Sequence, residues 1–368
     1  MINHERMLNT FMEYVKIDSE TKNEKAIGER IIKDLNELGF EVYIDEAGKK
    51  LNSNGNNVYC FIPGTLDSES MLFSAHMDTV TPGIGIEPYI DGEYIKSKGN
   101  TILGGDDKAG VVAILEAIRI IKENNLPHRP IEIVFTICEE GGVNGVKEVE
   151  FQKLKSKKGI VLDSGGSPSK IITEAPGQSK IFASVIGKTS HAGACPEAGI
   201  SSIMAAAEAV TNMKLLRVDS ETTANIGTFK AEGPTNIVSP LVEIIAEARS
   251  RSIEKLNKQT EHMIECLKAA CDKYGAKLEY KIENSYYSYA IDLNDEHIKT
   301  VSKVCDNLGL EVELIPSGGG SDANVYNLNN IKAINIGTGM ELVHTTDERL
   351  NIEDFQNAAK VVLKLMTM

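Results

Sequence analysis

Met71-Leu72-Phe73-Ser74-Ala75-His76-Met77-Asp78 is the stretch that decides the fold of this chain of 368 residues. Its first five residues form a short, mostly apolar run, which is typical of a buried β-strand. Similar strands are predicted at residues 131–137 and 159–162, and an apolar helix is predicted at residues 109–121. Strands that alternate with helices predict an α/β domain with a mixed, largely parallel sheet flanked by helices.

Side chains that can bind metals or move protons follow each of these predicted strands at once. They are His76, Asp78, Glu139, Glu140 and Asp163. Open α/β sheets place their functional sites outside the carboxyl ends of the strands. The arrangement is therefore itself an indication of a functional site.

The pattern of elements changes at about residue 177. From there the predicted order is strand, helix, strand, strand, helix and strand, at residues 180–187, 200–216, 224–231, 241–249, 253–274 and 277–284. This order, βαββαβ, is the ferredoxin-like arrangement. We expect a discontinuous catalytic domain, residues 1–176 and 286–368, with an inserted α+β domain of residues 177–285.

The composition narrows the classes of partner and compartment. The formal net charge is −14 and no cluster of lysine and arginine outweighs the acidic residues, so a nucleic-acid partner is not expected. No run of about 18 apolar residues occurs, so no membrane association is expected. The first residues do not resemble a secretory signal and the six cysteines lack CxxC spacing, which predicts a reduced, cytoplasmic protein.

Six acidic and histidine positions have the chemistry of a two-metal site. They are His76, Asp106, Glu139, Glu140, Asp163 and His344. Two histidines and three carboxylates can hold two metal ions if one carboxylate bridges them. The remaining glutamate, beside a ligand, can then act as general base on water. Each motif alone also fits a turn, a solvated acidic loop or a surface histidine, and only their combination favours the metal site.

The order of these motifs resembles the zinc aminoacylase/carboxypeptidase superfamily (M20-type metallopeptidases), and within it the peptidase T branch. The resemblance covers essentially the whole chain. The motifs that carry it are Ser74-Ala75-His76-Met77-Asp78-Thr79-Val80, Gly104-Gly105-Asp106-Asp107-Lys108-Ala109-Gly110, Glu139-Glu140-Gly141-Gly142, Leu162-Asp163-Ser164-Gly165-Gly166, Gly318-Gly319-Gly320-Ser321-Asp322-Ala323, and Gly337-Thr338-Gly339 with the later His344.

The resemblance implies the ligands of two divalent metal ions, zinc or else cobalt or manganese. One ion would be bound by His76 and Asp163, the other by Glu140 and His344, with Asp106 as the bridge. Glu139 would be the general base and would later protonate the leaving amine. Asp78 would orient the ring of His76. The family also has a cis peptide after the bridging aspartate, here between Asp106 and Asp107.

The resemblance also implies roles for the inserted domain, which corresponds to the lid and usual dimerisation domain of the family. In dimeric members the histidine matching His191 reaches the site of the partner and stabilises an oxyanion, so a homodimer through this domain is expected. Asn236, Arg249, Gly319 and Gly320 match positions that bind substrate. For Arg249, an ion pair with Glu247 on the same strand face is the alternative.

The sequence thus predicts a two-zinc peptidase that releases the N-terminal residue from dipeptides or tripeptides. Asp163, in place of a glutamate, resembles the peptide-cleaving branches. Gly318 stands where peptidase T has an arginine, so strict tripeptide specificity stays open. Two alternatives also stay open: a zinc amidohydrolase that removes acyl groups from amino acids, and a relative that binds ligands without turnover.

Overall fold

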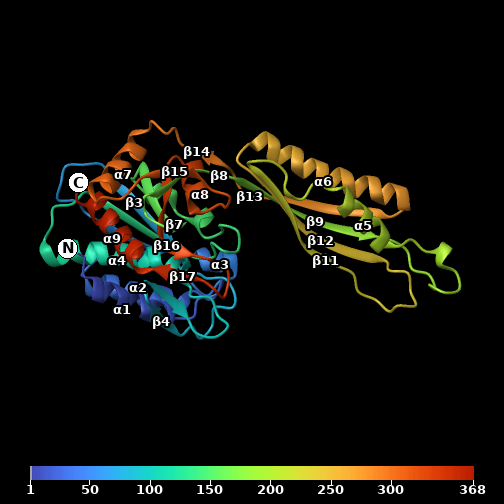
Figure 1. Ribbon diagram of the computed structural model, residues 1–368, viewed down its shortest axis with the longest axis horizontal. Helices are drawn as coiled ribbons and strands as arrows, with labels where there is room; N and C mark the ends of the chain where they lie inside the picture. The colour runs from blue at the N-terminus through green and yellow to red at the C-terminus, as the bar shows by residue number, and fades with distance from the viewer. Residues whose placement is uncertain (1) are drawn as a thin grey trace. The chain divides into compact units, whose positions relative to one another are not determined.

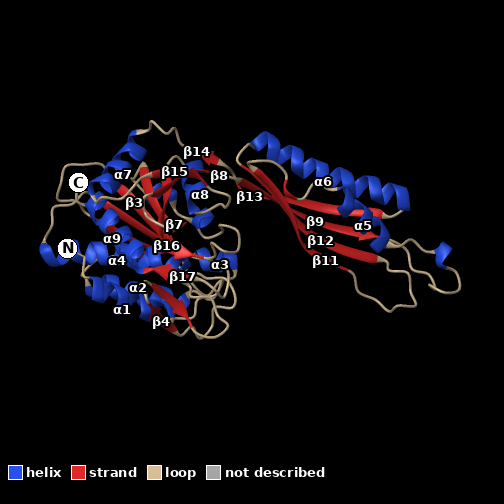
Figure 2. Cartoon of the chain, in the orientation of Figure 1, coloured by secondary structure: helices blue, strands red, loops and turns tan. Residues whose placement is uncertain are grey.

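The computed structural model describes residues 2–368, which form two compact units (Figures 1 and 2). Of the described residues, the larger unit consists of residues 2–174, 290–317 and 321–368, and the smaller unit of residues 175–289 and 318–320. The predicted boundaries put residues 318–320 in the catalytic domain, whereas the structure groups them with the smaller unit. The roles assigned to the two domains stay predictions.

A mixed sheet of 12 strands forms the centre of the larger unit. Its main order is β1-β2-β6-β3-β7-β16-β17-β5-β4, with β8, β14 and β15 joined to it at the side. The strands are β1 (Val42–Ile44), β2 (Val58–Ile62), β3 (Met71–His76), β4 (Pro88–Asp91), β5 (Tyr94–Ser97), β6 (Ile131–Thr136), β7 (Lys158–Gly165), β8 (Lys170–Ala175), β14 (Tyr289–Ala290), β15 (Glu313–Pro316), β16 (Lys332–Glu341) and β17 (Arg349–Asn351). The neighbours β6, β3, β7 and β16 are parallel, and the outer pairs on the main path are antiparallel.

Helices flank this sheet, as predicted. They are α1 (His4–Val15), α2 (Lys25–Glu37), α3 (Ala47–Leu51), α4 (Gly105–Asn124), α7 (Glu296–Asn307), α8 (Asp322–Leu328) and α9 (Ile352–Met366), with short 3₁₀ turns at Val146–Glu148 and Phe151–Lys153. Helix α4 packs against β3 and the helices α1 and α9, so nearly all of its sides are buried. Its many apolar residues suit this position. The mixed α/β class predicted from the strand and helix pattern is confirmed.

The parallel strands at the centre bring their carboxyl ends to one edge. Strands β3 and β6 are buried along their whole length and run in register from Met71 beside Ile131 to His76 beside Thr136. Strand β7 pairs with the other side of β3. The polar residues that follow these strands therefore emerge next to one another.

The smaller unit is an antiparallel sheet covered on one face by two helices (Figure 2). The strand order is β10-β11-β12-β9-β13. Its elements are β9 (Gly177–Ile186), a 3₁₀ turn (Pro196–Ala198), α5 (Ser202–Asn212), β10 (Leu216–Arg217), β11 (Thr222–Lys230), β12 (Leu241–Ser250), α6 (Ile253–Tyr274) and β13 (Lys277–Tyr286). The βαββαβ order predicted from sequence is present, with the short strand β10 added between α5 and β11.

One helix of this unit is shorter than predicted. Helix α5 ends at Asn212, whereas the apolar pattern predicted a helix to residue 216. Met213 has extended backbone angles, and the N–H of Lys214 donates to Nε2 of His262 on α6. Leu216 then starts the short strand β10. The apolar residues beyond Asn212 thus belong to a turn and a strand.

His297 on α7 is a buried histidine of the larger unit that lies apart from the candidate site. Its Nε2 donates to the carbonyl of Gly159, 2.9 Å away, and its side chain has no solvent exposure. Burial lowers the pKa of His297 from 6.5 to about 4, the charges of Lys158 and Lys332 add to the effect, and the hydrogen bond to Gly159 and the charge of Asp295 oppose it. The folded protein therefore keeps this imidazole neutral where the unfolded chain protonates it.

This histidine is expected to make the larger unit less stable in acid. Because its folded pKa is lowered, its contribution is complete above pH 6.5 and falls as the pH drops towards 4. Between pH 8 and pH 5 the loss is about 2 kcal/mol. Urea unfolding in EDTA at the two pH values measures it, and His297→Gln should lose that much less stability over the same range. Equal losses in the two proteins would contradict the assignment.

Candidate metal centre and active site

The five predicted metal ligands converge around the carboxylate of Asp106. Its Oδ1 lies 3.0 Å from Nε2 of His76, and its Oδ2 lies 3.2 Å from Nε2 of His344. The two oxygens thus face different histidines, as a bridging carboxylate requires. Asp163 Oδ1 is 3.8 Å from Nε2 of His76, and Glu140 Oε1 is 3.0 Å from Nε2 of His344.

Two groups of side chains in this cluster have ligand atoms close enough to share an ion. They are His76, Asp106 and Glu140, and His76, Asp107 and Asp163. Asp107 was not among the predicted ligands. Its Oδ2 accepts the N–H of His76 and its Oδ1 accepts the N–H of Gly110. Asp107 therefore positions the end of β3.

Glu139 lies directly beside this cluster. It follows β6, is 8% exposed, and precedes Glu140 in the chain. Burial raises the pKa of Glu139 well above its usual value, and the negative charges of Asp322, Glu140 and Asp78 add to the effect, while His76 opposes it. A carboxylate with a raised pKa in a polar site is suited to take up and release a proton.

Asp78 orients His76, but mainly through its backbone. Nδ1 of His76 lies 2.9 Å from the carbonyl oxygen of Asp78 and 3.6 Å from its carboxylate. A proton on Nδ1 donated to that carbonyl leaves the lone pair of Nε2 directed at the cluster. The carboxylate instead accepts the N–H groups of Glu139 (2.8 Å) and Glu140 (3.2 Å) and the hydroxyl of Thr21 (2.8 Å).

The turn that carries Glu139 and Glu140 is held by buried side chains from distant segments. Asn57 accepts the N–H of Ile137, and Glu24 accepts the N–H and the thiol of Cys138. With the two bonds to Asp78, four consecutive N–H groups have side-chain acceptors. Cys138 has a φ of +53°, so the chain turns sharply after β6.

The side chain of Glu348 likewise holds the backbone of the loop that carries Asp106. Its Oε2 accepts the N–H groups of Leu103 and Gly104, both at 2.8 Å, and its Oε1 accepts the N–H of Asp106 at 3.1 Å. Burial raises the pKa of Glu348 to about 7, and the charge of Asp106 adds to this. The peptide between Asp106 and Asp107 is cis, as the resemblance predicted.

Asn335 on β16 clamps the backbone of Asp163. Its Oδ1 accepts the N–H of Asp163 at 2.9 Å, and its Nδ2 donates to the carbonyl of Asp163 at 2.5 Å. Asn57, Glu24, Glu348 and Asn335 were all missed from the sequence. No local pattern in the sequence marks any of the four.

The charges of the cluster fit metal cations. Burial, followed by the charge of Asp106, raises the pKa of Asp163 well above its usual value. The carboxylates of Asp106 and Glu140, which lie 3.2 Å and 3.0 Å from Nε2 of His344, raise the pKa of His344 to about 10. Burial would raise the pKa of Asp106, but hydrogen bonds from His344 and His76 outweigh it and lower that pKa. The cluster thus has an excess of negative charge.

One buried atom supports the same fit. Oε1 of Glu140 has no hydrogen-bond partner, although Nε2 of His344 lies only 3.0 Å away. Nitrogen and oxygen donors of this kind are ligands for zinc and similar divalent ions. His344 is 52% exposed, so the cluster is open to solvent on that side. The residues present therefore fit a pair of divalent metal ions.

His191 and Asn236 lie on adjacent loops of the smaller unit. The N–H of Ala192 donates to the carbonyl of Asn236, and His191 forms a β-bridge with Ile237. Nδ1 of His191 accepts the N–H groups of Gly193 and Ala194. The proton of the neutral ring is therefore on Nε2, which can act as a donor.

Arg249 forms the ion pair that was its alternative role. Its Nε lies 2.8 Å from Oε1 of Glu247, and Gln178 donates to the same carboxylate at 2.5 Å. Both side chains are on the helix-free face of β12, as the alternation predicted. Gly320 packs against the ring of Tyr286, where an added Cβ would lie 2.2 Å from the ring. Gly319 precedes it, and substrate contacts of either glycine stay predictions.

Residues 72–368 match the sequence pattern of peptidase family M20/M25/M40. The chain belongs to this family. A tripeptidase of Staphylococcus aureus (TM-score 0.94) and aminopeptidase PepT of Bacillus cereus (TM-score 0.89) have similar structures, each 40% identical and covering 100% of this chain and 98% of the other. An uncharacterized protein of Bacillus subtilis is 40% identical over 366 residues, 100% of this chain and 99% of its own.

This M20-family chain is therefore a metallopeptidase of the peptidase T-like branch, and the resemblance inferred from its motifs is confirmed. The cluster of His76, Asp106 and their neighbours offers candidate ligands for the metal ions. Within residues 2–368, no helix is both long and apolar enough to cross a membrane.

Removing one oxygen of Glu348 should loosen the Asp106 loop. In Glu348→Gln an amide NH₂ replaces an oxygen that accepts backbone N–H groups, so donor would face donor. We expect metal affinity or kcat/KM for peptides to fall roughly 10–100-fold with the fold retained. Chelator competition and peptide hydrolysis measure this, with the exposed Glu353→Gln as the matched control. If the Glu348→Gln protein binds metal as tightly and hydrolyses peptides as fast as that control, the positioning role is disproved.

Proposed function

We propose that this chain is a two-zinc aminopeptidase that releases the N-terminal residue from dipeptides or tripeptides. The observation that carries the proposal is the placement of the two oxygens of Asp106 against two different histidines, with Glu139 buried beside them. The similar solved structures are a tripeptidase and an aminopeptidase, which supports short peptides as the substrate.

The two metal ions, when bound, would polarise the scissile carbonyl and make water nucleophilic at neutral pH. The protein residues then have separate tasks. The carboxylate of Glu139 takes the proton of the attacking water and delivers it to the leaving amine. Asp78 keeps Glu139 and the ring of His76 in place through the hydrogen bonds described above. His76, Asp163, Glu140, His344 and the bridging Asp106 would hold the ions.

The smaller unit would supply the remaining contacts. The Nε2 proton of His191 is a donor for the oxyanion of the tetrahedral intermediate, in our proposal within the site of a partner subunit. Asn236, Arg249, Gly319 and Gly320 would bind the peptide. Arg249 would exchange part of its ion pair with Glu247 for the carboxylate of the substrate.

Dimerisation through the smaller unit is supported by its uncovered sheet face. Its helices cover only one face, and large apolar side chains are exposed on the strands, including Phe229, Ile245 and Tyr280 at 41–44% exposure. A face of this kind favours contact with another protein surface. We also propose a cytoplasmic location, supported by six cysteines that form no disulfide in the described chain.

The substrate class is tested with a panel of Ala-Ala, Ala-Ala-Ala, N-acetylated Ala-Ala-Ala and N-acetyl amino acids, with added zinc, cobalt or manganese. We expect release of the N-terminal residue from free peptides only. Glu139→Gln should lose roughly 10²- to 10⁴-fold in kcat while still binding metal, because the proton acceptor is removed. The exposed Glu353→Gln serves as control.

The other results of this panel have definite meanings. Cleavage of N-acetyl amino acids in place of free peptides would make the protein a deacylase. No turnover of any substrate by a protein that binds two metal ions would refute the proposed peptide specificity. Full activity of Glu139→Gln would refute the role of general base.

The role of His191 across a dimer is tested by mixing two inactive variants. His191→Ala lacks the oxyanion donor and Glu139→Ala lacks the base, so each homodimer should be inactive. In a mixed dimer one site has an intact Glu139 and receives an intact His191 from its partner. Up to half of the wild-type activity per mixed dimer is therefore expected. Verified mixed dimers without recovered activity would exclude the trans role.

A further inference from the structure

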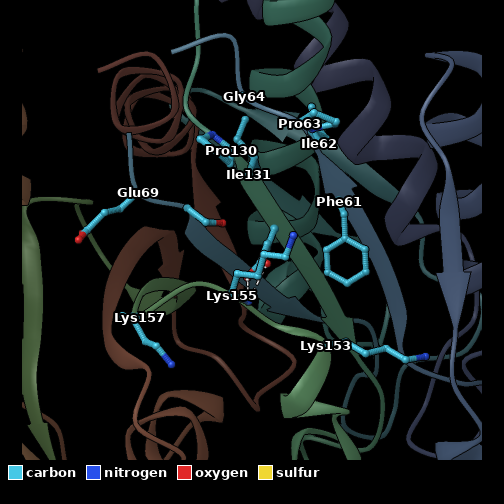
Figure 3. A pocket seen from close by; sticks show the side chains of 12 residues that line it. Phe61, Ile62, Pro63, Gly64, Glu69, Pro130, Ile131, Lys153, Lys155 and Lys157 are labelled. Atoms are coloured by element: carbon cyan, nitrogen blue, oxygen red, sulfur yellow. Dashed lines mark hydrogen bonds between the residues drawn. The ribbon is translucent and has the colours of Figure 1, made fainter. Parts of the chain in front are cut away.

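The larger unit has a cavity at the end of its central strands that is opposite the metal cluster. The cavity has a volume of about 880 Å³ and is lined by residues at the amino ends of β3 and β6, among them Ser70 and Ile131. Figure 3 shows this cavity, with Ile131 labelled. The metal cluster follows the carboxyl ends of the same strands, at His76 and Glu139. The volume lies within the range of about 300–1,000 Å³ typical of small-molecule sites.

The wall of this cavity is largely apolar. It is formed by the end of β2 with Phe61 and Ile62, by two prolines, and by the start of β6 with Ile131 (Figure 3). The prolines are Pro63 and Pro130. Phe61 is 37% exposed, so its ring presents apolar surface to the cavity. Covering such surface with an apolar ligand removes it from water, which favours binding.

Three lysines line the cavity, with Lys155 between Lys153 and Lys157 in Figure 3. The ammonium of Lys153 is already paired, 2.9 Å from Glu150 and 3.6 Å from the centre of the Tyr43 ring. Among residues 2–368, the ammonium groups of Lys155 and Lys157 have no ion pair or hydrogen bond. Two exposed positive charges are thus free at the rim of an apolar cavity.

The nearby carboxylates do not neutralise these lysines. Glu132 accepts the backbone N–H groups of Lys155 and Ser156, so its oxygens are occupied and buried. Glu69 is exposed and its nearest cation is Lys158, at 3.9 Å. The cavity therefore combines apolar walls with unpaired positive charge.

We propose that this cavity binds an organic anion with an unbranched apolar tail, of the fatty-acid carboxylate class. The tail would lie against Phe61, Pro63 and Pro130, and the carboxylate would pair with Lys155 and Lys157, whose flexible side chains can follow the head group. This site is separate from the metal cluster and does not depend on the proposed peptidase activity.

Two other occupants fit the cavity less well. A nucleotide base would need polar partners along the wall, but Phe61, Pro63 and Pro130 offer only apolar side chains there. A peptide strand would need a free sheet edge, but β1 covers β2 as far as Cys60, so only Phe61 and Ile62 leave an edge free, which is too short for a strand. An apolar tail needs neither of these.

Isothermal titration calorimetry of the full-length protein with octanoate tests the proposal. We expect one saturable site, with at least ten-fold weaker binding of butyrate, which lacks the tail, and of octylammonium, which has the wrong charge. Lys155→Gln/Lys157→Gln should weaken octanoate binding at least ten-fold. The matched control is Lys299→Gln/Lys303→Gln on α7, which removes the same charge from two exposed lysines and should bind as the wild type does.

A second variant tests the apolar wall without a change of charge. Phe61→Ala should weaken octanoate binding several-fold and leave butyrate unaffected, and circular dichroism verifies that each variant is folded. The proposal is overturned if octanoate shows no saturable binding. It is equally overturned if the Lys155/Lys157 variant binds like its control, or if butyrate binds as tightly as octanoate.

Discussion

The hydrogen bonds of Asp78 connect the two strand ends on which the candidate metal centre is built. Its carbonyl fixes the ring of His76 at the end of β3, and its carboxylate accepts the N–H groups of Glu139 and Glu140 after β6. Asp78 is fully buried, so without these donors its charge would have neither water nor partners, which costs several kcal/mol. The two strand ends are therefore tied to one arrangement.

The other candidate ligands are secured in the same way, by polar side chains that hold backbone groups. Glu348 fixes the loop of Asp106, and Asn335 fixes the backbone of Asp163. These bonds assemble the ligands before any ion binds, which reduces the reorganisation that binding requires. The electrostatic cost is visible in the raised pKa values of Asp163 and Glu140, where burial is the first cause. Metal cations would offset that cost.

The two ends of the central strands carry chemically different groups of residues. Strand β3 spans Met71–His76, so its ends are separated by roughly 17–20 Å. At the carboxyl end, histidine and carboxylate side chains gather at the metal cluster. At the amino end, the segments before β3 and β6 leave an apolar cavity with lysines at its rim. At this distance the charges at one end of the strands have little effect on the charges at the other end.

The sequence by itself determined the α/β class, the ferredoxin-like order of the smaller unit and the metallopeptidase family. These follow from local patterns, such as apolar runs, the polar residues directly after them and the order of short motifs. It also indicated two possible roles for Arg249, but only the folded sheet shows that the ion pair with Glu247 forms.

Only the tertiary structure revealed the residues that hold the site together. Glu24 accepts a hydrogen bond from the N–H of Cys138, 114 residues away, and Glu348 accepts one from the N–H of Leu103, 245 residues away. A glutamate or asparagine at such a position has the same local sequence as one exposed to solvent. Its function arises from burial next to a backbone N–H group, and burial at that distance along the chain is decided by the fold.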